Sequence, residues 1–166
     1  MAKMGRLDIK GLKEFQQKLK SMKDPDAFVE SCAKELAARL LAKVIKRTPV
    51  GDYETWSTDD QGNRVRTKKA AKKGGTLRRG WTGEKRLSAS AYAESLAVQH
   101  VGSDYVIEIV NPVEYASYVE FGHRTANHKG WVPGRFMMTI SEQELQAIAP
   151  QVLEAKVRKY MEGLVK

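Results

Sequence analysis

The sequence predicts an α+β fold in which an antiparallel β-sheet is packed by a long N-terminal helix and a C-terminal helix, with a long basic loop insertion. Three observations predict it. Apolar residues recur with a helical period between residues 25 and 47, alternate as in strands between residues 95 and 110, and return to a helical period near the C-terminus. The 166 residues fall within the usual size of one domain. We therefore expect a single domain, 1–166, that contains the insertion at 51–75.

Two helices are expected before residue 50. In the first, residues 11–22, one face carries the apolar residues Leu12, Phe15, Leu19 and Met22. The second begins at Asp24-Pro25, where an N-cap residue precedes a proline at the first helical position, and runs to Arg47. Its apolar stripe contains Phe28, Cys32, Leu36, Leu40 and Val44. It ends at Thr48-Pro49, because the residue before a proline is disfavoured in the α region.

Strands are expected after the insertion. Residues 80–87 and 95–102 are assigned as the first two. Residues 104–110 give the strongest strand pattern, because Tyr105, Ile107 and Ile109 share one face. Gly102-Ser103-Asp104 predicts a hairpin turn between the last two strands.

Two further helices are expected in the C-terminal part of the chain. Asn111-Pro112 repeats the cap-plus-proline signal and opens a short helix that ends at Gly122. Ser141, followed three residues later by Glu144, predicts a capping box for the C-terminal helix. Pro150 is expected to kink or restart that helix.

Candidate catalytic and metal-binding residues are few. His123 and His128, with Glu120 nearby, suggest a metal site, but a spacing of five is not that of helical ligand pairs, and polar loop residues are the favoured interpretation. Cys32 lies among apolar helical neighbours and is expected to be a buried, inert thiol. The sequence contains no nucleophile elbow, phosphate-binding loop or dinucleotide fingerprint, and no apolar run that could span a membrane. We therefore expect neither an enzyme nor a bound cofactor.

The net charge of +9 is a local feature. Residues 61–86 contain ten cations and one acid, whereas the rest of the chain holds 19 cations and 19 acids. Three interpretations are open: a solvated loop, neutralisation of nucleic-acid phosphates without reading of sequence, and docking onto an acidic protein surface. Aromatic residues do not interleave with the cations between residues 64 and 73, so base stacking is not indicated. The candidate docking residues are Arg64, Arg66, Lys68, Lys69, Lys72, Lys73, Arg78 and Arg79.

Four segments, read together and in order, carry a family resemblance. They are Lys46-Arg47-Thr48-Pro49-Val50, Gly75-Thr76-Leu77-Arg78-Arg79-Gly80-Trp81, Tyr115-Ala116-Ser117-Tyr118-Val119-Glu120-Phe121-Gly122 and Trp131-Val132-Pro133-Gly134-Arg135-Phe136-Met137. Over roughly residues 10–165 the chain resembles the gene-product-ten-like family of tailed-phage neck, tail-completion and head–tail joining proteins. The motif residues expected to have structural or interface roles are Thr48, Pro49, Leu77, Trp81, Tyr115, Tyr118, Glu120, Phe121, Gly122, Pro133 and Phe136.

The third segment contains three aromatic residues and one carboxylate. The aromatic side chains are anchors either for a core or for a subunit contact, and the core is the favoured interpretation. They are Tyr115, Tyr118 and Phe121. Glu120 is expected either to cap a backbone or to pair with Arg78 or Arg124.

The resemblance implies a structural virion protein that forms a homo-oligomeric ring in the neck, the head–tail connector or the head-proximal end of the tail, with six copies favoured over twelve. The implied partners are a connector or stopper, a tail terminator or tube, and packaged DNA in the lumen. Such a protein is made in the host cytoplasm and located in the virion. Members typically have only a few residues between Thr-Pro-Val and Gly-x-Leu-Arg, so the resemblance does not account for the basic insertion. The alternative is a non-specific nucleic-acid-binding protein that uses the basic loop.

Overall fold

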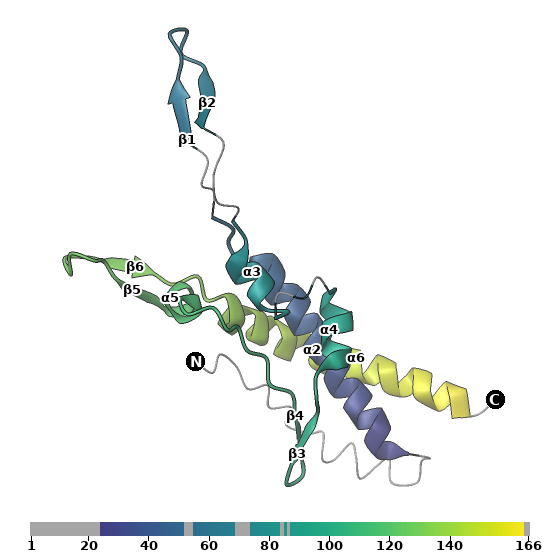
Figure 1. The fold of residues 1–166 in the computed structure, drawn as a ribbon. Coiled ribbons are helices and arrows are strands. Elements are labelled where there is room, and N and C mark those ends of the chain that lie inside the picture. The colour runs from purple at the N-terminus through teal and green to yellow at the C-terminus, as the bar shows by residue number, and fades with distance from the viewer. Residues whose placement is uncertain (1–23, 52–54, 69–73, 84, 86, 165–166) are drawn as a thin grey trace.

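A computed structural model describes residues 24–51, 55–68, 74–83, 85 and 87–164 of the chain. Two long helices, α2 (Pro25–Arg47) and α6 (Met137–Leu164), pack on each other and form the scaffold. Three short helices join them, namely α3 (Thr76–Gly80), α4 (Ala89–Ser95) and α5 (Ala116–Phe121), and slender ribbons project from this scaffold (Figure 1). The predicted α+β class, with its long helix and C-terminal helix, is confirmed. The helix predicted over residues 11–22 lies outside the described residues.

The strands pair only with their neighbours in sequence. In the described part of the chain they form three antiparallel ribbons: β1 (Thr55–Thr58) with β2 (Arg64–Lys68), β3 (Gln99–Val101) with β4 (Asp104–Val106), and β5 (Gly122–Arg124) with β6 (Trp131–Pro133). The turn predicted at Gly102-Ser103 is confirmed, since Val101 pairs with Asp104 across it. The single helix-covered sheet expected from the sequence is replaced here by these separate ribbons.

Helix α2 forms where the sequence predicts it. The Asp24 side chain accepts a hydrogen bond from the Ala27 amide at 3.2 Å and so caps the N-terminus. Leu36, Leu40 and Val44 of the apolar stripe are buried in a core that also includes Trp81, Met137 and Leu145, whereas Phe28 and Cys32 belong to a second, smaller cluster. Cys32 is buried, as predicted, and burial raises the pKa of its thiol to about 11. The thiol is therefore protonated at neutral pH and unreactive.

The segment between the insertion and β3 differs from the prediction. Residues 80–87 were expected to form a strand, but the chain instead makes α3 and then a turn. Residues 89–95 form α4, whose N-terminus is capped by the Ser88 hydroxyl accepting from the Ala91 amide at 3.2 Å. Ala93 of α4 is fully buried in the core that contains α2. Small alanines allow that close packing, and only the last part of the expected strand, Gln99–Val101, remains extended.

The predicted helix starts at Asn111 and Ser141 are also wrong. Helix α5 begins at Ala116, because Asn111 is used as a bridge: its amide donates to the Leu77 carbonyl at 2.8 Å, and its carbonyl accepts from the Val113 amide at 3.2 Å. Helix α6 begins four residues before Ser141, whose hydroxyl donates to the Met137 carbonyl at 2.6 Å inside the helix.

Glu144 links the two long helices instead of capping one. Its carboxylate accepts from Lys43 at 2.8 Å and from Arg47 at 2.6 Å. These contacts from α2 hold the pKa of Glu144 below its usual range, with the Lys43 hydrogen bond as the largest cause. Helix α6 continues past Pro150 without interruption.

The end of α2 is joined to α3 through one buried threonine. The Thr48 hydroxyl donates to the Val44 carbonyl at 2.6 Å and accepts from the indole N–H of Trp81 at 2.8 Å. The Thr48 carbonyl accepts two hydrogen bonds from the Arg78 guanidinium, at 2.6 and 3.1 Å. Thr48 and Trp81 are both fully buried. The Thr-Pro-Val and Gly-x-Leu-Arg segments are therefore two halves of one junction, and α2 ends at Thr48 as predicted.

This junction predicts the effect of removing a single hydroxyl. Thr48→Val keeps the shape of the side chain but leaves the buried Trp81 N–H without an acceptor, which costs about 1–3 kcal/mol. Thermal or denaturant unfolding measures the loss. Thr58→Val on the exposed strand β1 is the matched control, with an expected change within about 0.5 kcal/mol. Equal stability of the two variants would contradict the role given to Thr48.

Candidate assembly surfaces

The part of the insertion that the structure describes is a β-hairpin that projects from the scaffold, β1–β2 (Figure 1). Its turn is organised by Asp59, whose carboxylate accepts from the amides of Gln61 at 3.0 Å and Asn63 at 2.8 Å. The hydrogen bond from the Asn63 amide is the main reason why the pKa of Asp59 is below its usual range. Gly62 has a φ of 83°, which favours glycine in this turn.

The sequence pattern predicted an aperiodic loop for this segment, because strands of four and five residues are too short to show alternation. The signal that could have revealed it is the turn-forming run Asp59-Asp60-Gln61-Gly62-Asn63 between two short β-prone segments. At the base of the hairpin, Gly51, which precedes it, and Gly74, which follows it, come close together. A Cβ on Gly74 would lie 2.1 Å from the Gly51 carbonyl oxygen, so only glycine fits there.

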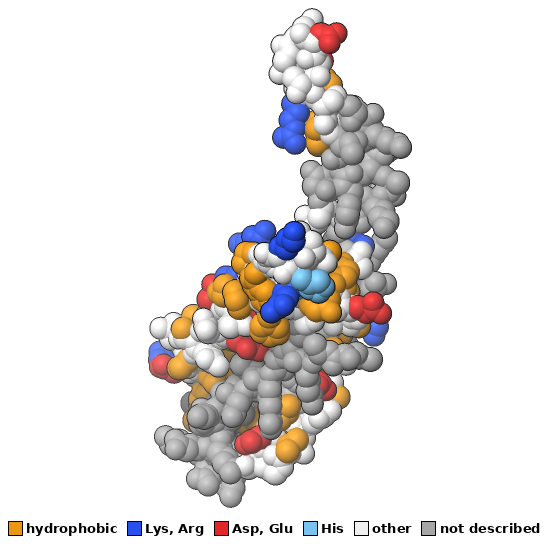
Figure 2. Space-filling view, turned by 90° about the vertical axis from the view of Figure 1, so that its left-hand side faces the viewer, with side chains coloured by type: hydrophobic (Ala, Val, Ile, Leu, Met, Phe, Trp, Pro, Cys, Tyr) orange, Lys and Arg blue, Asp and Glu red, His pale blue; other side chains and the backbone are white. Residues whose placement is uncertain are grey.

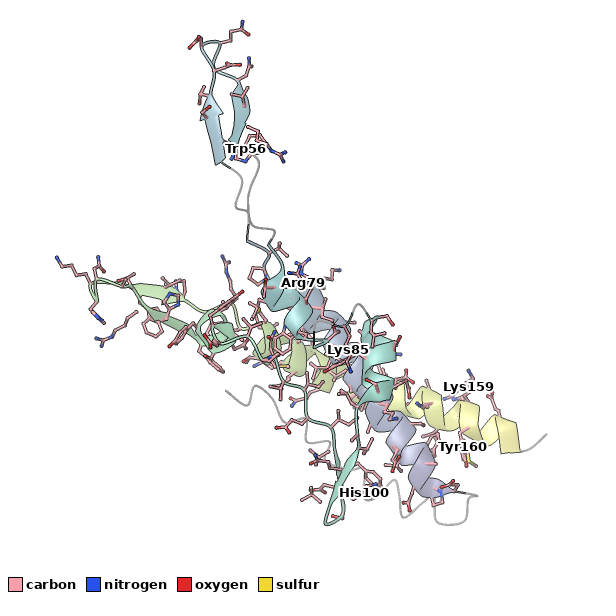
Figure 3. All side chains as sticks on the ribbon, viewed as in Figure 1. Trp56, Arg79, Lys85, His100, Lys159 and Tyr160 are labelled. Atoms are coloured by element: carbon pink, nitrogen blue, oxygen red, sulfur yellow. The ribbon has the colours of Figure 1, made fainter. Side chains whose placement is uncertain are left out.

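The hairpin gathers two arginines on one aromatic side chain. The Arg64 and Arg66 guanidinium groups lie 5.0 and 5.9 Å from the ring centre of Trp56, which stands opposite Arg66 in the register (Figure 3). Trp56 is still 42% exposed. The sequence showed no aromatic residue among these cations, because Trp56 comes from the other strand. Cation–π contacts of this kind orient guanidinium groups at an exposed surface.

The other cations of the basic tract have different places. Lys68 is the last residue of β2, whereas Lys69, Lys72 and Lys73 lie outside the described residues. Arg78 is partly buried and holds the Thr48 carbonyl, so we leave it out of the candidate docking surface. Arg79 is exposed beside the base of the hairpin, where it donates to the Gly74 carbonyl at 3.2 Å (Figure 3).

A second projecting ribbon, β5–β6, carries a set of exposed aromatic residues. We call this ribbon, together with α5 and Phe136, the arm. Three of its aromatic side chains, Tyr118, Phe121 and Trp131, are 59%, 54% and 60% exposed. The core placement favoured for the α5 aromatics is therefore wrong, and Tyr115 is exposed as well. Only Ala116 and Glu120, four residues apart on one face of α5, are buried, so the aromatics occupy its other faces.

The histidines considered as metal ligands lie on this arm. The His123 ring packs against Tyr118 with a centroid distance of 5.7 Å, and His128 sits in the turn between β5 and β6 with a φ of 53°. The Glu120 carboxylate is bonded elsewhere, at the start of α6. Within the described residues, no group of three or more side chains of metal-binding type occurs.

The arm is attached to the scaffold by the buried side chain of Glu120. One carboxylate oxygen accepts from the Met138 amide at 3.0 Å; the other accepts from the Thr139 amide at 2.9 Å and from the Thr139 hydroxyl at 2.8 Å. These amides belong to the first turn of α6, where backbone N–H groups have no partner within the helix and a negative charge is favoured. Of the two roles expected for Glu120, capping a backbone is confirmed.

Backbone hydrogen bonds also join the end of α5 to the residues that precede α6. The carbonyls of Val119 and Glu120, at the end of α5, accept from the amides of Arg135 at 2.8 Å and Phe136 at 3.0 Å. Glycines make this approach possible: a Cβ on Gly134 would lie 2.3 Å from the Glu120 carbonyl oxygen, and Gly122 ends α5 with a φ of 86°. The Val-Glu-Phe-Gly and Pro-Gly-Arg-Phe-Met segments therefore form one structural unit.

We predict that Glu120→Gln destabilises the protein. The amide can offer only one oxygen, and its NH₂ group faces a buried backbone N–H, so the loss is about 2–3 kcal/mol and Tm falls by about 4–10 °C. Glu154→Gln, an exposed position on the same helix α6, is the control and is expected to change stability little. A Tm for Glu120→Gln equal to that of the control would contradict the capping role.

None of the helices in the described part of the chain has the length and apolarity needed to cross a bilayer. Neither a curated protein nor a solved structure matches the chain. The family described as "Bacteriophage HK97-gp10, putative tail-component" matches residues 13–122, which is more than half of the sequence. The matched range contains the Thr48–Trp81 junction, the β1–β2 hairpin, and α5 with Glu120 and Gly122. The chain therefore belongs to the HK97-gp10-like family of bacteriophage tail components.

Proposed function

We propose that the protein is a structural, non-enzymatic subunit of a ring in the neck or at the head-proximal end of the phage tail. Membership in a family of tail components supports a place among other virion proteins. The observation that carries the proposal is the architecture of the chain, in which a helical scaffold holds out ribbons with exposed aromatic and cationic side chains. Surfaces of this kind suit contacts with other subunits. We favour six copies over twelve, in line with the usual symmetry of tails.

The polar contacts of the scaffold agree with this role. Thr48 and Glu120 use buried hydrogen bonds to join one element to the next, and each stands where a ribbon leaves the helices. A subunit that presents its contact surfaces in a preformed geometry loses less conformational entropy on assembly. The proposed neighbours in the virion are a connector or stopper on one side and a tail terminator or tube on the other.

The location is tested with purified virions. Gold-labelled antibody against this chain is expected to mark the junction of head and tail, in a signal that is absent from empty heads without tails. Labelling along the tail shaft or at its distal tip would contradict the proposed position. If the chain is missing from purified virions altogether, the structural role itself fails.

We also propose that the β1–β2 hairpin touches packaged DNA in the lumen of the ring. The supporting observation is the pair Arg64 and Arg66, both exposed and both held over Trp56. Guanidinium groups presented along a strand can bind phosphates without reading the base sequence. The same observation favours the alternative function, non-specific nucleic-acid binding outside the virion, and the localisation experiment separates the two.

A DNA-binding hairpin predicts a particular salt dependence. Arg64→Ala combined with Arg66→Ala is expected to weaken retention of duplex DNA and to lower the slope of log affinity against log salt by roughly 1.8, about 0.9 for each phosphate that is no longer neutralised. The control is Arg158→Ala with Lys159→Ala, two exposed cations on α6 (Figure 3). An equal effect of both double variants would contradict a specific role of the hairpin. Unchanged DNA binding with loss of the chain from virions would indicate an acidic protein partner instead.

A further inference from the structure

We propose that Glu142 makes the attachment of the arm sensitive to pH. A proton on the Glu142 carboxyl group lets α5 and α6 close firmly on each other, and loss of that proton loosens the junction that Glu120 forms with the start of α6. The inference goes beyond the proposed function, because it concerns a property of the isolated chain.

The arm depends on this junction for its position. Figure 2 views the molecule from the side on which the arm lies and shows hydrophobic side chains at the surface, with cationic and histidine side chains among them. The ribbon begins with the pair Gly122 and Pro133, two residues after Glu120. In the described part of the chain, β5 and β6 pair with each other and with no third strand. Such a ribbon has little stability of its own, so a change at the junction is passed on to the arm.

The Glu142 side chain lies at the turn of α6 that Glu120 binds. Side chains on a helix lean toward its N-terminus, over the residues three and four positions earlier, which for Glu142 are Thr139 and Met138. The Glu120 carboxylate accepts hydrogen bonds from the amides of these same two residues. Two carboxyl groups are therefore close enough at the first turn of α6 for the charge of one to act on the other.

One oxygen of Glu142 has no hydrogen-bond partner. Glu142 Oε1 is buried and unpaired, and among the described residues the other buried side-chain atom in this condition is His123 Nδ1, on the arm. Glu120, in contrast, is 1% exposed and accepts three hydrogen bonds. A buried carboxylate oxygen without a donor is costly. A proton reduces this cost, because a neutral carboxyl group is more easily buried than a charged one.

The described residues around this end of α6 supply no cation to Glu142. Helices α2 and α5 pack against α6, and the one charged residue of α5 is Glu120. The residues one turn away from Glu142 on its own helix carry no charge. The other titratable and charged groups on these elements have different contacts or are exposed; they are Lys43 and Arg47 of α2, Glu144 of α6, His123 of β5, and Arg135.

The direction of the pH effect follows from these contacts. Burial, and after it the charge of Glu120, raise the pKa of Glu142 above the ordinary value of 4.5. The folded chain therefore binds this proton more tightly than the unfolded chain does. The stabilisation by the proton is complete below the ordinary pKa and is lost as the pH rises through the raised pKa. At higher pH the junction holds a second negative charge that has no partner.

The stability of Glu142→Gln tests the proposal, because glutamine has the shape of the protonated side chain and no charge. In mildly alkaline solution we expect the Tm of the full-length variant to exceed that of the wild type by about 2–4 °C. The difference disappears as the pH falls to the ordinary glutamate pKa of 4.5. Glu154→Gln, at an exposed position of α6, is the control and should show no such gain. Variant and wild type are compared at each pH, because the lowered pKa of Glu144 affects both proteins alike.

Amide hydrogen exchange shows whether the effect reaches the arm. In mildly alkaline solution, the amides of Met138 and Thr139 and the paired amides of β5–β6 are expected to exchange about fivefold faster in the wild type than in Glu142→Gln. At acid pH the two proteins exchange alike at these sites. Comparison at one pH removes the change of the intrinsic exchange rate with pH. The paired amides of the β3–β4 ribbon, which is not attached at this junction, serve as the internal control.

A double variant tests the part given to Glu120. In a Glu120→Gln background the repelling charge is absent, so the gain in Tm from Glu142→Gln is expected to be smaller than in the wild type. An equal gain in both backgrounds would contradict an action through Glu120.

Three results would overturn the inference: no gain in Tm for Glu142→Gln, a gain that is the same at every pH, or unchanged exchange of the arm. All of these measurements use the isolated full-length chain. A negative result therefore leaves the proposed position in the virion standing, whereas absence of the chain from purified virions would remove the proposed function and leave this inference intact.

Discussion

The carboxylate of Glu120 is the contact on which the arrangement of the C-terminal half depends. It lies at the end of α5 and accepts hydrogen bonds from the first amides of α6, while the carbonyls at the end of α5 accept from the amides that lead into α6. The N–H groups at the start of α6 and the carbonyl groups at the end of α5, which lack partners within their own helices, are thus hydrogen-bonded at this junction. Burial and the nearby Glu120 charge raise the pKa of Glu142, in the second turn of α6. Because the ribbon β5–β6 leaves and returns at this point, the junction determines where the arm projects.

The helical scaffold was largely predictable from the sequence. Helix α2 has a local cap, a long apolar stripe and a proline stop, and all three signals act within a few residues of each other. The starts of α5 and α6 were not predictable in this way. Asn111 and Ser141 have the residue types of helix caps, but their side chains have other partners. Asn111 hydrogen-bonds to Leu77, and Ser141 hydrogen-bonds to Arg47 and Met137. The cap of α6 comes instead from Glu120, 18 positions before the Met138 amide that it accepts from. Long-range partners override local signals here.

The residues of the candidate surfaces could be identified from the sequence, but their arrangement in space could not. The basic tract was visible from composition, yet the pairing that brings Trp56 to Arg64 and Arg66 exists only in the hairpin. The aromatics of α5 were expected in the core because large apolar residues usually are. They lie outside because the buried face of this short helix is taken by Ala116 and Glu120. Exposed aromatics and buried charge are the exceptions to the usual pattern, and in this chain both occur at the arm.

Amide hydrogen exchange of the isolated full-length chain tests most directly whether Glu120 holds the arm in place. We predict protection of the amides of Met138 and Thr139 and of the paired amides among residues 122–124 and 131–132. In Glu120→Gln, exchange at these sites becomes faster, while the amides in the middle of α2 keep their protection. Rapid exchange of the arm in the wild-type chain, or equal exchange of the arm in both proteins, would contradict the central claim that this carboxylate positions it.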